Sequence, residues 1–375
     1  MKKIAMFVFA LLFATASLFA QNEGFSKVTK KLEKAVHSFK YKPEEKNLQK
    51  LEDTFQKSLK SDPAQEHYMW RLMGEAFYFV NVKEKRDFGK AFEYYTKALE
   101  MVPESLHAER SVCLYNLGLM YLRGHHVERN LEKAVELFTE SSKEGYLPAD
   151  VAMAKMYNFG LGVEKDFAKA DEFYLKLIEQ GHNVFSERYS MLYVQANADA
   201  PDDVEANNLF EKALVGLFLE ESEEVIFKDL MKASDMGHAA AKTTLAELRL
   251  AGKFISESSL DLGVAEQLTQ NASAKGYVHG IFVQAQIIER STWGKMFQWD
   301  RAKQYWNLYQ KAAELGHPLS QCAVGVVYSG EAPPVLSLLK MKPDKEKAYE
   351  WFSKAAEQGW PTAKNKALQY KSYAK

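Results

Sequence analysis

The feature that most constrains this 375-residue chain is a short phrase that recurs along it. The phrase reads EKAVELFTESSKEGY at residues 132–146, AKADEFYLKLIEQGH at 168–182 and KAYEWFSKAAEQGW at 347–360. A glycine followed by an aromatic or histidine residue closes it at Gly145, Gly181, Gly237, Gly276, Gly316 and Gly359. The successive intervals are 36, 56, 39, 40 and 43 residues. Periods of that size are typical of stacked helix pairs.

Residue sizes at fixed distances after each glycine indicate how the helices pack. The ninth residue after the glycine is small: Ala154, Ser190, Ala246, Ala285 and Gly325. The twelfth is mostly large with an apolar stem: Tyr157, Tyr193, Arg249, Ile288 and Tyr328. Positions three apart share a helix face, so a small residue beside a large one lets neighbouring helices approach and interlock. We therefore expect each repeat to be a helix A, a loop, a helix B and a glycine turn, with Gly118 at the close-approach position of one helix A.

The clearest copy, LYNLGLMYLRGHHVERNLEKAVELFTESSKEGY at residues 114–146, resembles the Sel1-like repeat family, whose members are close relatives of tetratricopeptide repeat (TPR) proteins. The resemblance continues through residues 153–182 and covers roughly residues 110–365. It implies an all-α, right-handed α-solenoid of stacked helix–turn–helix repeats in which helix A lines the concave side. Upstream, RLMGEAFYF and DFGKAFEYYTKALEMVPES look like one TPR-like unit.

This reading divides the chain into segments. We expect a signal peptide at 1–20, capping helices at 21–62, the TPR-like unit at 63–109 and the Sel1-like array at 110–365. A tail follows at 366–375. Insertions interrupt the array near 195–225, where we expect one lengthened helix pair, and near 331–343.

The first residues have the pattern of a secretory signal peptide. A basic start, Met1-Lys2-Lys3, precedes an apolar run from Ile4 to Phe13 and then small residues up to Ala20. We expect cleavage after Ala20, with cleavage after Ala16 as the alternative. A retained anchor is disfavoured because the run is shorter than the roughly 20 residues a membrane span needs. The pattern predicts a secreted or periplasmic protein without a transmembrane span after cleavage.

Charge and chemistry-bearing residues exclude several functions. The 49 basic and 50 acidic residues are balanced, which argues against nucleic-acid binding. Cys113 and Cys322 lie far apart along an elongated array, so we expect two buried free thiols. The spacing of His125, His126 and Glu128 does not suit a metal site. With no catalytic motif in the sequence, we expect no catalytic residue, metal or cofactor.

Two sets of residues are candidates for binding a partner. The first comprises helix A positions that the core pattern leaves free and that we expect on an exposed groove: Asn116, Met120, Asn158, Glu247 and Gln321. The second lies in the loop at 331–344, which is apolar where other repeats place polar residues: Val335, Leu336, Leu338, Leu339 and Met341. Such a loop either packs on its own chain or binds a partner.

Three tryptophans, Trp293, Trp299 and Trp306, form a further candidate surface. Aromatic planes there would suit stacking on a sugar or a peptide. The alternative is core packing, because helix B needs large residues to stack.

These observations favour a non-enzymatic, monomeric adaptor that binds a protein or peptide on a solenoid groove. One alternative is a glycan-handling envelope protein that uses the tryptophans. A second is a relative of the cysteine-rich Sel1-like branch linked to β-lactam binding or hydrolysis. That branch has a cysteine pair in each repeat, which this chain lacks.

Overall fold

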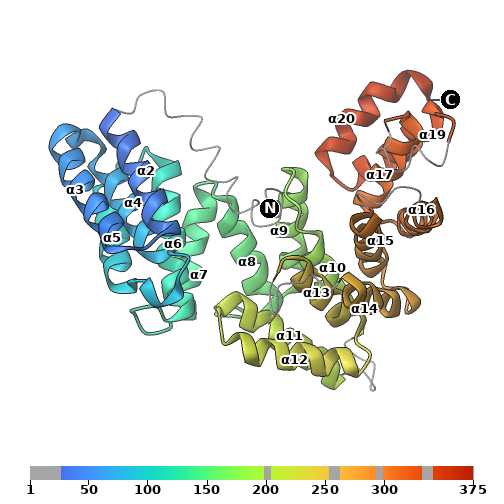
Figure 1. Cartoon of the computed structure of the whole chain (residues 1–375), viewed down its shortest axis with the longest axis horizontal. Coiled ribbons are helices and arrows are strands. Elements are labelled where there is room, and N and C mark those ends of the chain that lie inside the picture. Colours follow the sequence, from blue (N-terminus) through green and yellow to red (C-terminus); the bar gives the residue numbers. More distant parts are fainter. Residues whose placement is uncertain (1–26, 198–203, 253–261, 293–298, 332–340, 375) are drawn as a thin grey trace. The chain divides into compact units, whose positions relative to one another are not determined.

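The computed structural model describes residues 27–197, 204–252, 262–292, 299–331 and 341–374. Every regular element among them is a helix (Figure 1), which confirms the predicted all-α array of helix pairs. The chain divides into two compact units, and the boundary in the sequence falls between Phe173 and Tyr174. This boundary lies within α9 (Phe167–Glu179). The signal peptide predicted at residues 1–20 lies outside the described residues and stays a prediction.

The first unit consists of consecutive helix pairs. Neighbouring helices along the chain pack against each other, and α2 also packs against α4. Its helices are α2 (Lys27–Tyr41), α3 (Glu45–Ser61), α4 (Glu66–Tyr78), α5 (Phe88–Met101), α6 (His107–Arg123), α7 (Leu131–Lys143) and α8 (Leu147–Phe159), with short 3-10 turns at Pro63–Gln65 and Lys83–Lys85.

The second unit continues the pairing and contains one additional helix. Its helices are α10 (Phe185–Ala196), α11 (Val204–Leu219), α12 (Glu223–Asp235), α13 (Ala239–Leu250), α14 (Leu262–Ala274), α15 (Val278–Thr292), α16 (Trp299–Glu314), α17 (Pro318–Ser329), α19 (Lys345–Glu357) and α20 (Pro361–Tyr370), followed by the 3-10 turn η4 (Lys371–Tyr373). The described residues of the interval from Gly181 to Gly237 therefore hold three helices. The expectation of a single lengthened pair is wrong, because α11 and α12 already form a pair with a short connection.

The glycines of the repeated phrase form the predicted turns. All six have a positive φ, between 78° at Gly276 and 92° at Gly237 and Gly316, a conformation that glycine adopts without a Cβ clash. At Gly145 the amide donates to Ser142 at 2.9 Å, and the amide of Tyr146 donates to Ser141 at 3.1 Å. This pair of hydrogen bonds is the Schellman arrangement that closes a helix.

Helix B begins in the same way in four repeats. An Asp or Asn side chain accepts a hydrogen bond from the backbone N–H of the phrase's lysine, three residues later: Asp87 from Lys90, Asn130 from Lys133, Asp166 from Lys169 and Asp344 from Lys347. These caps stabilise the free N–H groups of the first helical turn. The backbone N–H of Asp344 also donates to Tyr328 at 2.8 Å, as that of Asn130 donates to Tyr121 at 3.0 Å. The loop that begins at residue 331 therefore rejoins the regular repeat at Asp344.

Close approach between helix A and helix B occurs where the sequence predicts small residues. A Cβ at Gly118 would lie 2.7 Å from Phe138, a Cβ at Gly325 would lie 2.7 Å from Phe352, and a Cβ at Gly74 would lie 2.8 Å from Tyr95. Real Cβ atoms almost never come so near a ring carbon. The aromatic ring of helix B therefore rests directly on the backbone of helix A in all three repeats.

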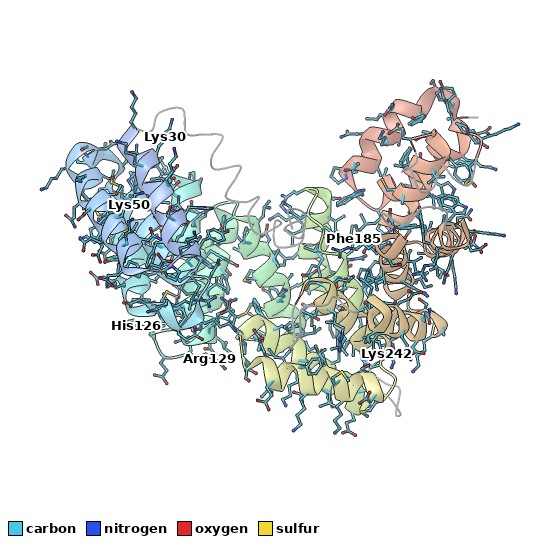
Figure 2. The ribbon with its side chains drawn as sticks, viewed as in Figure 1. Lys30, Lys50, His126, Arg129, Phe185 and Lys242 are labelled. Atoms are coloured by element: carbon cyan, nitrogen blue, oxygen red, sulfur yellow. The ribbon has the colours of Figure 1, made fainter. Side chains whose placement is uncertain are left out.

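Helix α10 lies against several repeats of the second unit through an aromatic stripe, which we define as Phe185, Tyr189 and Tyr193. These residues are four apart and share one helix face. They contact a row of residues that directly follow turn glycines: His238, Tyr277, His317 and Trp360. The ring centroids are 5.6 Å apart for Phe185–Trp360, 5.2 Å for Tyr189–His317, 4.9 Å for Tyr193–His238 and 5.1 Å for Tyr193–Tyr277. Figure 2 labels Phe185 at the start of α10.

A chain of hydrogen bonds connects helices beneath Tyr189. The backbone N–H of Ser320 donates to Nδ1 of His317, so the proton of a neutral His317 ring lies on Nε2. That nitrogen donates to Nδ1 of His279 at 3.3 Å, and Nε2 of His279 then donates to Glu247 at 3.0 Å. The hydroxyl of Ser186 donates to the other Glu247 oxygen at 2.7 Å. The hydrogen bond that caps α17 at His317 thus determines which group donates and which accepts in every later bond of this series.

The two cysteines are free thiols in different units. Cys113 is buried, and burial raises the pKa of its thiol to about 12; burial also raises the pKa of the half-buried Cys322. Both thiols are therefore poor nucleophiles at neutral pH. Among the described residues, no helix combines the length and apolar character that crossing a bilayer requires.

Replacing Gly118 with Leu should lower the free energy of unfolding by about 1–3 kcal/mol or more, because the side chain overpacks against Phe138. Phe138→Ala alone should also destabilise, by about 3–5 kcal/mol, because it leaves a cavity. The double variant should lose less than the two single losses together, since the leucine enters the space that the ring leaves. Urea unfolding of the three variants measures this coupling, and purely additive losses would show that the contact does not limit packing.

Acidification should destabilise the second unit. Burial, with Lys275 nearby, lowers the pKa of His238 to about 4, and burial beside His279 lowers that of His317 well below its usual value. Below the unfolded pKa of about 6.5 the unfolded chain binds more protons than the folded chain, so the free energy of unfolding decreases as the pH is lowered, for His238 down to about pH 4. His238 should contribute a loss of about 2 kcal/mol between pH 7 and pH 5, and His317 should add a further loss of the same sign.

The matched control for this pH effect is His317→Asn, which keeps a side-chain acceptor at the helix N-terminus and removes the titrating ring. Urea unfolding at pH 7 and pH 5 should show a smaller pH-dependent loss in this variant than in the natural chain. The same loss in both proteins would mean that His317 does not resist protonation in the folded state.

Candidate functional site

The helix A positions expected on an exposed groove are mostly buried. Asn116, Met120, Asn158 and Gln321 are at most 5% exposed, so the expectation that they are free to bind a partner is wrong. The amide nitrogen of Asn116 donates to the backbone carbonyl of Val112 at 2.8 Å, one turn earlier in the same helix.

The reason lies in the surroundings of helix A. In α6, consecutive residues are buried all round the helix: Val112, Cys113, Leu114, Asn116, Leu117, Gly118, Leu119 and Met120. A helix buried on every face lies inside the array and has no free polar stripe. Positions outside the small–large pattern therefore contact a neighbouring helix and not solvent.

Glu247 and Gln321 belong to internal hydrogen-bond networks of the second unit. Glu247 is partly exposed, with 28% of its side chain accessible, but both its oxygens accept from Ser186 and His279. Gln321 donates to the Ala313 carbonyl at 3.1 Å and accepts from Gln358 at 2.8 Å. Both side chains hold neighbouring elements together.

Of the five apolar loop candidates, four lie outside the described residues: Val335, Leu336, Leu338 and Leu339. Met341 is half-buried and packs against the core cluster that contains Trp306 and Val324. For Met341, the structure therefore supports packing on its own chain.

The tryptophan surface is not formed at Trp306. This residue is 7% exposed and meets Tyr328 edge-on at 6.1 Å, so the core-packing alternative is correct for it. Trp293 and the side chain of Trp299 lie outside what the structure describes; Trp299 is the first residue of α16.

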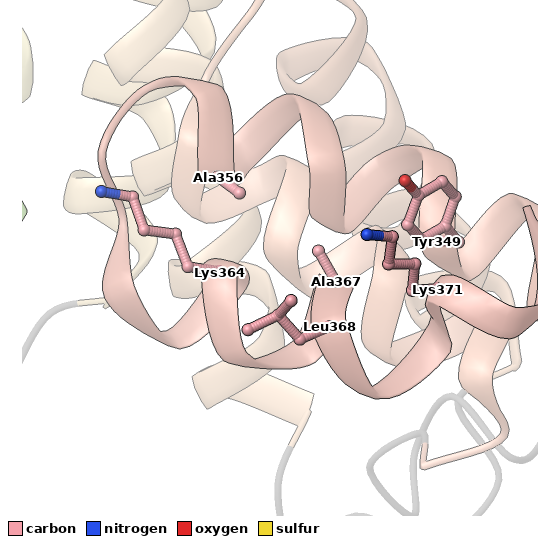
Figure 3. A pocket seen from close by; sticks show the side chains of 6 residues that line it. All are labelled: Tyr349, Ala356, Lys364, Ala367, Leu368 and Lys371. Carbon is pink, nitrogen blue, oxygen red and sulfur yellow. The ribbon is translucent and has the colours of Figure 1, made fainter.

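A hollow of about 370 Å³ lies between α19 and α20 and is the best candidate binding surface. We call it the α19–α20 pocket; its lining residues are Tyr349, Ala356, Lys364, Ala367, Leu368 and Lys371. Figure 3 shows Lys364 at one end and Lys371 beside Tyr349 at the other, with Ala367 and Leu368 between them. Leu368 is 69% exposed, the highest value among the exposed large apolar side chains of the described residues.

Comparison with α17 explains why this pocket is open. Figure 1 shows α17, α19 and α20 as neighbours in orange and red, and their packing agrees. The fifth, eighth and ninth residues after Gly316 are Gln321, Val324 and Gly325; all are buried, with Gln321 and Gly325 directly under α19. The corresponding residues after Gly359 are Lys364, Ala367 and Leu368. Lys364 and Leu368 are exposed, whereas Ala367 is partly buried against the cluster that contains Ala348 and Phe352 of α19.

Sequence reasoning missed this pocket although a signal for it was present. The ninth residue after the other five glycines is small, whereas after Gly359 it is Leu368. A leucine there prevents the close approach that Gly325 permits to Phe352, so a standard aromatic-bearing helix B does not fit.

The charge of the pocket is positive. The α20 segment contains Lys364 and Lys366 but no acidic residue, and Lys371 follows in η4. Lys366 is bound to Glu331 at 2.6 Å, whereas neither Lys364 nor Lys371 pairs with a carboxylate within the described part of the chain. An apolar surface between two unpaired lysines suits a ligand that is itself apolar and acidic. The described residues also contain no cluster of three potential metal ligands.

Comparison with known sequences identifies a repeat in several segments of the chain. A family model described as the Sel1 repeat matches residues 82–101, 111–146, 148–182, 306–317 and 337–360. Sel1 repeat proteins generally mediate protein–protein interaction and are generally non-catalytic. The alginate biosynthesis protein AlgK of Azotobacter vinelandii is 32% identical over 110 residues. That alignment covers 29% of this chain and 22% of AlgK, so this chain spans less than a quarter of that relative.

Solved structures with detectable similarity include two bacterial proteins. One is c5321, a protective antigen of uropathogenic Escherichia coli with an SLR fold, at 20% identity and a TM-score of 0.38, covering 95% of this chain and 70% of that one. The other is a Sel1 repeat protein from Oxalobacter formigenes, at 19% identity and a TM-score of 0.33, covering 70% and 92%. Five segments of this chain therefore match the Sel1 repeat, and its glycine-closed helix pairs agree with the helix–turn–helix form of that repeat.

Proposed function

We propose that the protein is a non-enzymatic adaptor that binds a protein partner at the α19–α20 pocket. The observation that carries the proposal is the exposed Leu368, which stands at a position that helix B covers in α17. Together with Ala356 and Ala367, Leu368 gives the hollow an apolar floor, and exposed apolar surface rimmed by polar residues marks protein-binding sites.

The packing of the second unit supports this location over the groove that the sequence suggested. The stripe of α10 covers the row of residues after the turn glycines, and the predicted helix A residues are buried. The pocket is therefore the candidate surface that the protein's own side chains cover least. The proposed setting, secreted or periplasmic, rests on the signal-peptide pattern of residues 1–20.

The glycan-handling alternative has weaker support. A relative named for alginate biosynthesis favours it, but the alignment covers 29% of this chain. Trp306, one of its three proposed stacking residues, is buried. The adaptor remains the better proposal because the pocket is lined by lysine, tyrosine and aliphatic side chains without a tryptophan.

Leu368→Glu should abolish capture of the partner and leave the melting temperature nearly unchanged, because the residue is mostly exposed and its replacement removes little buried area. The tagged mature protein is incubated with an envelope extract of the cells that make it, and captured proteins are identified by mass spectrometry. A partner that binds the pocket should fall at least about tenfold in abundance, which corresponds to about 1.4 kcal/mol.

The matched control is Leu315→Glu, since Leu315 is a leucine in the same unit that is 51% exposed and does not line the pocket. This variant should capture the partner as the natural chain does. Undiminished capture by Leu368→Glu would refute the proposed site, and equal loss in both variants would show a non-specific effect of added charge.

A further inference from the structure

We propose that the occupant of the α19–α20 pocket is an acidic amphipathic helix of a partner protein, which takes the place that helix B takes in the other repeats. This inference rests on the proposed function and specifies the ligand of the same pocket. It follows from the geometry of the uncovered positions, from their charge and from the size of Leu368.

The first argument is that the uncovered positions are those on which a helix lies elsewhere in this chain. In α17 the fifth residue after the turn glycine hydrogen-bonds to α19 and the ninth touches Phe352 of α19. The same positions in α20, Lys364 and Leu368, line the pocket. A surface of this geometry accepts a helix laid along α20, as a helix-in-groove complex does.

The second argument is charge. In other repeats a basic residue of the first helix pairs with acidic residues at the second: Arg110 of α6 with Glu140 of α7 and with Glu144 at its C-terminal cap, and Lys212 of α11 with Asp229 of α12. Lys364 and Lys371 are basic side chains of the same kind without such a partner among the described residues. An incoming helix with carboxylates on its contact face would pair with both.

The third argument is size. Where helix A has glycine, helix B supplies an aromatic ring, as in the pair of Gly325 and Phe352. At Leu368 the large side chain is on the α20 side of the contact. The incoming helix therefore needs a small residue opposite Leu368. A second copy of this chain fits less well in a symmetric contact, because that contact would bring two surfaces of the same positive charge together.

The test uses the full mature chain and a labelled synthetic peptide of α7, residues 130–145, with Phe138→Ala. This peptide is acidic, keeps Glu140 and Glu144, and offers a small residue opposite Leu368. Fluorescence anisotropy should show saturable binding that weakens at least about tenfold when both glutamates are replaced by lysine. The peptide that retains Phe138 should bind more weakly than the alanine peptide.

The charge-swapped chain, Lys364→Glu with Lys371→Glu, distinguishes a lost charge contact from a loss of folding, because an unfolded chain would bind neither peptide. It should reverse the preference and bind the lysine-bearing peptide better than the acidic one. Leu368→Ala should weaken binding of the acidic peptide, and Leu315→Ala should not.

Two results would overturn the inference while leaving the proposed function intact. One is partner capture that depends on Leu368 although neither peptide charge nor the charge swap changes peptide binding. The other is concentration-dependent dimerisation that Leu368→Ala abolishes, which would make a second copy the occupant. Partner capture that is independent of Leu368 would instead refute the proposed function itself.

Discussion

The contact between a small residue of helix A and an aromatic ring of helix B determines how this protein is built. Gly118 contacts the ring of Phe138, and Gly325 contacts the ring of Phe352. At each of these contacts a single aromatic ring separates the two helix backbones. Such a contact excludes water from both helices over a full turn, and burial of each ring stabilises the pair by roughly 1.5–3 kcal/mol. Because the contact recurs in separate repeats, each helix pair has the same spacing and the pairs can stack.

The same regularity explains where helix α10 lies. Stacked repeats bring their glycine turns into a row, and the residue after each glycine is His, Tyr or Trp. A helix with aromatic residues four apart matches that row, as Phe185, Tyr189 and Tyr193 do. The buried histidines also cap the following helices at His238 and His317, so the residues that contact α10 also fix the starts of α13 and α17.

Much of the repeat could be predicted from sequence because its signals are local. Glycine at a positive φ, a capping Asp or Asn three residues before the lysine, and a small residue nine positions after the turn depend only on nearby residues. The burial of Asn116 and Gln321 could not be predicted in this way, since it depends on neighbouring repeats that enclose helix A on every side. The position of α10 likewise depends on long-range contacts, although its aromatic spacing was visible.

The candidate site follows from a departure from the repeat and not from the repeat itself. Leu368 occupies a position where small residues are the rule, and it is flanked by two lysines that pair with no carboxylate in the described part of the chain. Repeats that obey the pattern bury their contact positions within the chain, so an exposed one is the natural place for a partner to bind.

The most direct measurement is amide hydrogen exchange of the mature chain, free and bound to its captured partner. If the α19–α20 pocket is the binding surface, slowed exchange should be concentrated in residues 345–373, and α10 with the row of residues after the turn glycines should exchange as in the free chain. Slowed exchange in α10 or in α4–α8, with residues 345–373 unchanged, would contradict the account.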